Sequence, residues 1–138
     1  MALTSSLALQ RAMRARLIAH APLVALLGGP AIYDDVPQGM REPYVSFGDI
    51  ATRDWSTKDD LGEEHFATLH VWSRQRGKKE AYDIIAEIDA ALDGAALTLD
   101  GHRLINLATT FWTVTRDRAS ELYQGVVRLR AVTEVTSD

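Results

Sequence analysis

The densest group of potential metal or acid–base ligands is a set of five acidic side chains within eleven residues: Asp54, Asp59, Asp60, Glu63 and Glu64. A calcium loop needs oxygen ligands in an alternating Asp-x-Asp-x-Asp-Gly register, which places them around one ion. The spacing here lacks that register. We therefore expect a solvated acidic loop without a metal. The alternative hypothesis is a small α+β enzyme, or a ligand- or metal-binding domain, with an acidic site near residues 54–64.

The imidazole side chains are spaced poorly for a shared metal. His65 and His70 are five residues apart in a predicted strand, so they point to opposite faces. His20 lies in a predicted helix and has neither a histidine nor a carboxylate four residues later. Together with His102, these residues are expected to be structural or surface histidines.

Motifs for catalysis are missing from the sequence. There is no cysteine, which excludes disulfides, thiolate zinc sites and cysteine nucleophiles. Gly28-Gly29-Pro30 is not followed by the Gly-Lys-Ser/Thr of a phosphate loop, and no Gly-x-Ser-x-Gly elbow occurs. We predict that the chain is not an enzyme and has no cofactor.

Charge and hydropathy exclude two further classes. The formal net charge is −4, with 15 basic and 19 acidic side chains, which does not favour a general nucleic-acid binder. No segment approaches the roughly 18 consecutive apolar residues of a membrane span, and the N-terminus lacks the pattern of a secretory signal. We expect a protein that is cytoplasmic at synthesis and makes no membrane contact.

Three helices are predicted from apolar periodicity. The first is capped by Ser5 or Ser6. A short second helix begins near Pro22 and is expected to bury Val24, Leu26 and Leu27. The third covers residues 79–92 with an apolar stripe at helical spacing, consisting of Ala81, Ile84, Ile85, Ile88 and Leu92.

The remaining chain is predicted to be mostly β-strand. Extended segments are expected at residues 31–36, 43–50, 64–74, 97–99, 103–115 and 121–133, with a tight hairpin turn at Asp100-Gly101. Both faces of the 64–74 strand carry large side chains, which is consistent with cover on both faces. The pattern predicts an α+β fold, in which a mainly antiparallel β-sheet has helices packed on one face, as one domain spanning residues 1–138.

Two features exceed what a simple core requires. Residues 51–63 lack periodicity and are predicted to form a long loop, with Trp55 in a polar setting. Trp55 is our candidate subunit-interface residue, because tryptophan is enriched at interface centres. The alternative is that Trp55 packs on its own core. Three strands are also unusually long, so they either project beyond the core or are split by bulges.

Several segments together resemble a known family. The chain has Pro-Leu-Val-Ala-Leu-Leu-Gly-Gly-Pro-Ala-Ile-Tyr-Asp-Asp-Val-Pro at 22–37 and Glu-Pro-Tyr-Val-Ser-Phe-Gly at 42–48. His-Val-Trp-Ser-Arg follows at 70–74, and Gly-Lys-Lys-Glu-Ala at 77–81. Over about residues 5–133 this resembles the tail-completion, or tail-terminator, proteins of long non-contractile-tailed phages, prophages and gene transfer agents.

The resemblance implies a structural role in a phage-like particle. The fold would be a β-sheet with helices packed on it, as expected independently above. The chain would form a homo-oligomeric ring, a hexamer, that caps the tail tube and joins it to the head connector or stopper protein. DNA would pass through the ring without specific binding. Assembly would occur in the bacterial cytoplasm, and the family provides no catalytic residues. A monomeric or dimeric bacterial adaptor is a further alternative.

Overall fold

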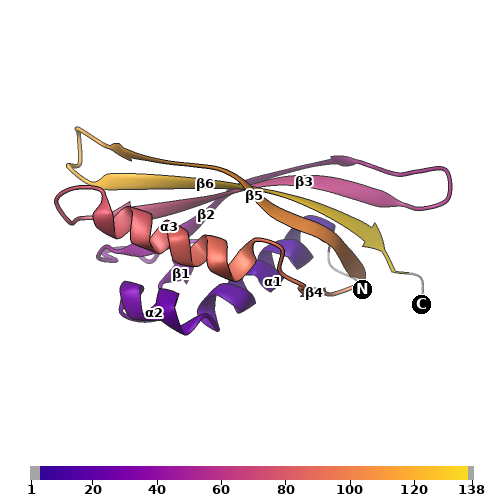
Figure 1. Ribbon diagram of the computed structural model, residues 1–138, viewed down its shortest axis with the longest axis horizontal. Coiled ribbons are helices and arrows are strands. Elements are labelled where there is room, and N and C mark those ends of the chain that lie inside the picture. The colour runs from indigo at the N-terminus through magenta and orange to yellow at the C-terminus, as the bar shows by residue number, and fades with distance from the viewer. Residues whose placement is uncertain (1–3, 137–138) are drawn as a thin grey trace.

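The computed structural model describes residues 4–136 of the chain, shown in Figure 1. The helices and strands follow one another in the order α1 (Ser5–Ile18), α2 (Ala21–Leu27), β1 (Ile32–Tyr33), β2 (Tyr44–Asp54), β3 (Gly62–Ser73), α3 (Lys79–Leu92), β4 (Thr98–Leu99), β5 (His102–Arg116) and β6 (Tyr123–Val135). None of the helices within this range is long and apolar enough to cross a membrane.

The strands form one sheet in the order β1-β2-β3-β6-β5-β4. β1 and β2 are parallel, and every other neighbouring pair is antiparallel. Figure 1 shows the helices together on one side of this sheet. The predicted α+β fold class is therefore confirmed.

The core lies between the helices and one face of the sheet. Leu69 of β3 pairs with Val127 of β6, and both side chains are fully buried. Residues of the same cluster come from α1 and α3, including Met13 and Ile88, which are also fully buried. At about 1.5–3 kcal/mol for each large apolar side chain, this cluster is the main source of stability.

Helix α3 packs closely against the centre of the sheet. All five residues of its predicted apolar stripe are buried. A Cβ atom placed on Gly125 of β6 would lie 3.0 Å from Ile85 Cδ1 and 3.1 Å from Val71 Cβ. The absence of a side chain at Gly125 therefore allows Ile85 to approach the strand backbone directly.

The start of α1 differs from the expectation. Thr4, not Ser5 or Ser6, is the N-cap residue, and its Oγ1 accepts a hydrogen bond from the Leu7 amide at 3.3 Å. The Ser5 hydroxyl instead donates to Glu63 Oε1 at 2.5 Å. This tertiary contact, which local sequence rules do not contain, uses the hydroxyl expected for the cap.

The buried side of α2 also differs from the expectation. Leu23 and Leu27 are the buried residues of this helix, whereas Leu26 is 38% exposed. The helix begins at Ala21 with Pro22 in its first turn. Leu23 and Leu27 are four residues apart and share a face, so Leu26 points away from the core.

The predicted loop at 51–63 is largely β-hairpin. β2 continues to Asp54 and β3 begins at Gly62, which leaves a connection of residues 55–61. Arg53 pairs with Glu64 across the two strands. Figure 1 shows this hairpin extending beyond the helical layer. Because this part has no core to bury, it has no hydrophobic alternation, and the sequence therefore indicated a loop.

The long strands project instead of breaking. β5 has two register shifts, between Leu104 and Asn106 and between Thr109 and Phe111, but it stays paired with β6 along its length. The β5–β6 turn lies at the opposite end of the molecule from the β2–β3 hairpin (Figure 1).

The expectation of cover on both faces of β3 is wrong. Phe66 is 45% exposed, because all three described helices pack on the other face.

Candidate functional site

The sheet face opposite the helices carries exposed aromatic side chains. Phe66 of β3 and Phe111 of β5 are 45% and 44% exposed. Each ring has a cation near it, with the Arg53 guanidinium 6.0 Å from the centre of Phe66 and Arg128 5.0 Å from that of Phe111. We call this surface the outer face. Every second side chain of each strand points to it, away from the core.

Trp55 joins the outer face at the end of β2. Its amide donates to the Gly62 carbonyl at 2.9 Å, which closes the hairpin. The indole lies 5.0 Å from the Arg53 guanidinium and 5.6 Å from that of Arg130. The residue is 45% exposed, so it is not buried in the core of its own chain.

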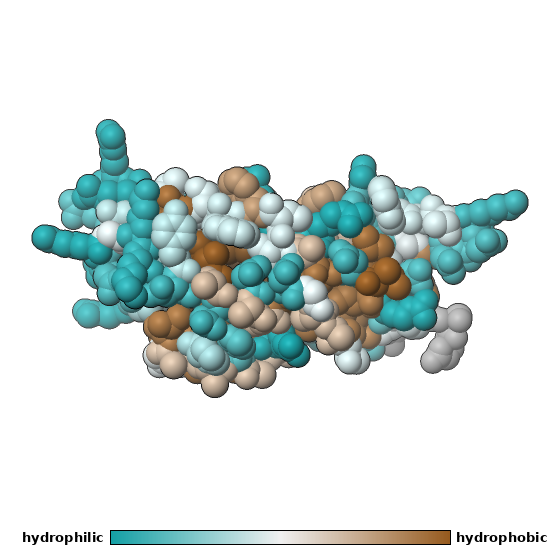
Figure 2. All heavy atoms as spheres, in the orientation of Figure 1, coloured by the Kyte–Doolittle hydropathy of each residue, from teal (hydrophilic) through white to brown (hydrophobic). Residues whose placement is uncertain are grey.

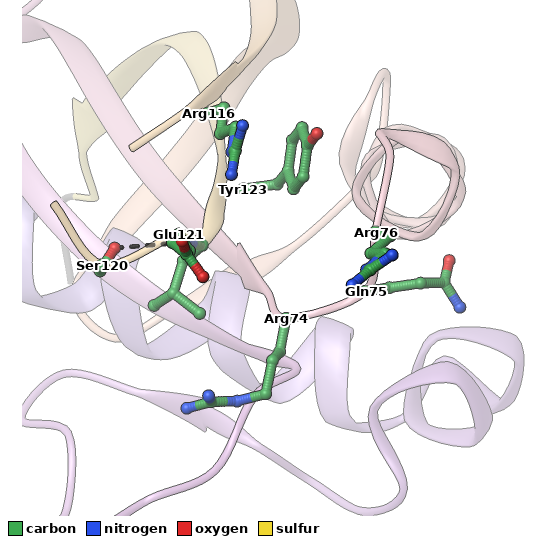
Figure 3. Close-up of a pocket in the computed structure, with 8 residues that line it drawn as sticks. Arg74, Gln75, Arg76, Arg116, Ser120, Glu121 and Tyr123 are labelled. Carbon is green, nitrogen blue, oxygen red and sulfur yellow. Dashed lines mark hydrogen bonds between the residues drawn. The ribbon is translucent and has the colours of Figure 1, made fainter. Parts of the chain in front are cut away.

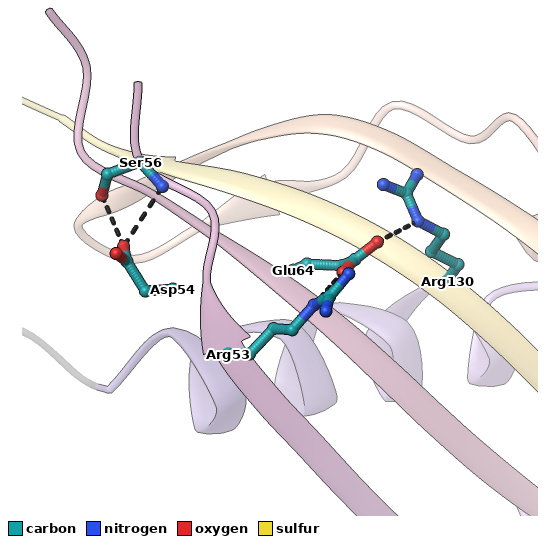
Figure 4. A network of polar contacts seen from close by, with 5 residues as sticks. All are labelled: Arg53, Asp54, Ser56, Glu64 and Arg130. Carbon is teal, nitrogen blue, oxygen red and sulfur yellow. Dashed lines mark hydrogen bonds and ion pairs between the residues drawn. The ribbon is translucent and has the colours of Figure 1, made fainter. Parts of the chain in front are cut away.

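Glu64 connects Arg53 and Arg130, the two arginines near Trp55, and Figure 4 shows the carboxylate between the two guanidinium groups. Its Oε1 accepts from Arg53 Nε and its Oε2 from Arg130 Nε, each at 2.5 Å. Burial favours the neutral acid, but the hydrogen bonds and charges of Arg130 and Arg53 outweigh it, so the pKa of Glu64 lies below its usual value. The carboxylate therefore stays ionised and fixes both guanidinium groups.

The other acidic residues of the group point in different directions. Asp54 accepts hydrogen bonds from the Ser56 hydroxyl and amide, which lower the pKa of Asp54, while Glu63 accepts from Ser5 on the helix side. Asp59 and Asp60 are exposed in the connection. Across residues 4–136, no three histidine or acidic side chains lie close enough to hold a metal ion.

The histidines are separated as their spacing predicted. His65 lies on the helix side, fully buried, with its ring nitrogens 2.8 Å from Thr52 Oγ1 and 2.9 Å from Thr133 Oγ1. Burial is the main cause of its lowered pKa. His70 Nδ1 is 3.0 Å from Gln124 Nε2, and burial lowers the pKa of His70 too.

Sequence reasoning selects Trp55 as a candidate interface residue but does not identify the residues that surround it. Arg53 and Glu64 are eleven residues apart, and Arg130 is far along the chain. The sheet order, with β3 between β2 and β6, brings them together. The alternation of Arg128 and Arg130 with apolar residues was a signal that both arginines share the outer face.

This fold places the chain among small α+β proteins in which helices cover one face of a mainly antiparallel sheet. The family of the tail completion protein gp17 matches residues 11–134, and the chain belongs to this family. A curated relative, the tail completion protein gp17 of Bacillus phage SPP1, is 25% identical over 126 residues, covering 91% of this chain and 92% of the relative.

Solved structures agree with this assignment. A chain in the virion of a native gene transfer agent particle is 33% identical, with a TM-score of 0.85, over 91% of this chain and 94% of that one. The structure of bacteriophage SPP1 gp17 has a TM-score of 0.57 at 23% identity, covering 97% and 92% of the two chains, and it supports the shared fold. The expected family is thus confirmed, and the enzyme alternative is not favoured.

Proposed function

We propose that the chain is a non-enzymatic structural subunit of a phage-like particle. It forms a homo-oligomeric ring, a hexamer, that caps the tail tube and joins it to the head connector or stopper protein. It assembles in the bacterial cytoplasm and then resides in the neck of the particle. Membership of the tail completion family and likeness to a chain of a gene transfer agent virion support this proposal.

The observation that carries the proposal is the outer face. Trp55, Phe66 and Phe111 each remain nearly half exposed although each lies beside an arginine. Tryptophan and arginine are the residue types most enriched where protein partners bind tightly. We propose that Trp55 contacts a neighbouring subunit of the ring.

The charge of the chain suits a ring that DNA crosses. A ring lined by many cations would hold phosphates electrostatically. The formal net charge is −4, so the chain has no overall excess of cations. This balance supports passage of DNA without specific binding.

The test is particle production in a host whose own copy of the gene is deleted. Trp55→Ala is expected to leave the isolated chain folded, as judged by circular dichroism, and to reduce complete particles at least tenfold. Trp55→Phe keeps an aromatic ring between the arginines and should restore most of the yield. Where rings form in solution, Trp55→Ala should weaken their association by about 2 kcal/mol or more.

The matched control is Trp112→Ala. Trp112 is 51% exposed, but its strand position places it opposite buried Val127, on the helix side of the sheet. Its substitution tests whether loss of any exposed tryptophan has the same effect. Normal particle yield from Trp55→Ala would contradict the role of this residue, and normal particles without the chain would contradict the proposed function as a whole.

A further inference from the structure

A basic recess lies at the end of the molecule opposite the β2–β3 hairpin. It has a volume of about 490 Å³ and lies between the turn after β3 and the β5–β6 turn, as Figure 3 shows. The residues that line it are Arg74, Gln75, Arg76, Arg116, Ser120, Glu121, Leu122 and Tyr123. This volume is within the range of about 300–1,000 Å³ that is typical of binding sites.

The recess contains cations that the chain itself does not neutralise. Arg74 pairs with Glu42 at 2.9 Å. Within residues 4–136, Arg76 and Arg116 have no ion pair, and both are exposed. The lining has one carboxylate, that of Glu121, against the three guanidinium groups of Arg74, Arg76 and Arg116. A guanidinium group matches a carboxylate or a phosphate through paired N–H donors, so the recess fits an anionic group.

The two turns that form the recess are shaped by unusual backbone. Gly77 has φ +85° in the turn after β3, and Glu121 has φ +60° in the β5–β6 turn. A left-handed conformation at a residue other than glycine costs about 1–2 kcal/mol. Such strain is found preferentially at functional positions, and here it lies within the lining of the recess.

The opposite end of the molecule carries exposed carboxylates. Thr57 and Asp60 close a tight turn through a hydrogen bond from the Thr57 amide to the Asp60 carbonyl at 2.9 Å. Asp59 and Asp60 are exposed there beside the exposed Lys58, and they make no ion pair within residues 4–136, although Asp60 interacts electrostatically with Arg103. In Figure 2, hydrophilic side chains gather at both ends of the long axis and apolar ones between them.

We propose that the basic recess binds the Asp59–Asp60 turn of a second copy of this chain. The turn and the recess lie at opposite ends of one chain, so they can meet only between copies (Figure 1). A contact between two different patches is heterologous and closes into a ring when the rotation between copies permits. The inference rests on the proposed function, since it assigns one of the contacts between ring subunits.

Charge reversal tests the pairing. One variant carries Asp59→Lys and Asp60→Lys, and a second carries Arg76→Glu and Arg116→Glu. Each alone places like charges in contact, and we expect at least a tenfold loss of complete particles. A chain with all four changes has reversed but complementary ends, and we expect it to regain at least half of the normal yield.

The four-change chain separates this inference from its competitors. If the turn and the recess bind different partners, both contacts are lost and this chain gives no more particles than the weaker two-change variant, which overturns the inference. If the recess binds phosphate, a short duplex DNA binds the normal chain, the recess variant releases it, and the four-change chain stays defective. In either case the Trp55 and gene-deletion results still decide the proposed function independently.

Cross-linking gives a second measurement that needs no charge reversal. The chain has no cysteine, so Asp60→Cys combined with Gln75→Cys introduces one thiol at each end. Oxidation of purified particles containing this variant should produce a ladder of covalent oligomers that reducing agent removes. Chains with either cysteine alone are the matched controls and should give no product beyond a dimer. A double-cysteine variant that gives no ladder in complete particles overturns the inference.

Discussion

Substitution of Ile85 by alanine tests how α3 is held on the sheet. Ile85 is 3% exposed, and replacing a buried isoleucine by alanine costs about 2–5 kcal/mol. The strand below Ile85 presents Gly125, which has no side chain to move into the cavity. Because collapse from this side is limited, we expect a loss in the upper part of that range, about 3–5 kcal/mol.

The contact between Ile85 and Gly125 predicts that the loss of stability caused by Gly125→Ala depends on the residue at position 85. In the normal chain the added methyl group meets Ile85 Cδ1 at 3.0 Å, and such overpacking costs about 1–3 kcal/mol. With Ile85→Ala that atom is gone, and the methyl group fills part of the cavity. We expect Gly125→Ala to be less destabilising there by at least about 1 kcal/mol, a coupling typical of residues in contact.

Urea denaturation of the unchanged chain, Ile85→Ala, Gly125→Ala and the double variant measures both the loss of stability and the coupling between the two positions. With a slope of about 2 kcal/mol per molar urea, Ile85→Ala should lower the midpoint by about 1.5–2.5 M. Asp83→Ala is the control on the same helix. It removes an exposed ion pair with Lys79 and should change stability by less than about 0.5 kcal/mol. An unchanged midpoint for Ile85→Ala, or additive effects of the two core substitutions, would refute this account of the packing.

Two further predictions concern a turn and a buried histidine. Gly101 has φ +76° in the β4–β5 turn, so Gly101→Val should destabilise the chain by at least about 1–2 kcal/mol in urea, and Gly101→Asn should cost less because asparagine tolerates this conformation. Burial lowers the pKa of His65, with Glu63 opposing, so the unfolded chain binds a proton near pH 6.5 before the folded chain does. Stability should therefore fall as the pH drops below about 6.5, and His65→Gln should flatten that dependence in urea midpoints measured at pH 7.5 and 5.5.

The parts of the fold that contact the core were predictable from the sequence. α3 was placed at residues 79–92 because Ile84, Ile85 and Ile88 recur at helical spacing, and packing against the sheet requires that pattern. The turn at Asp100-Gly101 was predicted because the chain reverses there, and Gly101 has the positive φ that its type suggested.

The surfaces were less predictable because distant segments create them. Arg76 and Arg116 are forty residues apart in the chain and line one recess. They come together because β6 lies between β3 and β5 in the sheet and pairs with both. The sequence predicts a loop for the polar hairpin around Asp54, because its strands are held by cross-strand pairs instead of a buried face. Neither feature has a local sequence pattern.

The two hydrogen bonds of Glu64 to Arg53 and Arg130 change the expectation for how Trp55 binds a partner. A long loop at residues 51–63, as the sequence predicts, would be mobile in an isolated subunit and would become ordered only on assembly. The structure instead has paired strands up to Asp54, a hydrogen bond from the Trp55 amide to Gly62, and a carboxylate holding Arg53 and Arg130 against the indole. Ordering a side chain at an interface costs about 0.5–1.5 kcal/mol, and these contacts meet much of that cost before a partner arrives. Because Glu64 makes both arginine contacts, Glu64→Gln should weaken assembly through loss of this preorganisation even though Trp55 itself is unchanged.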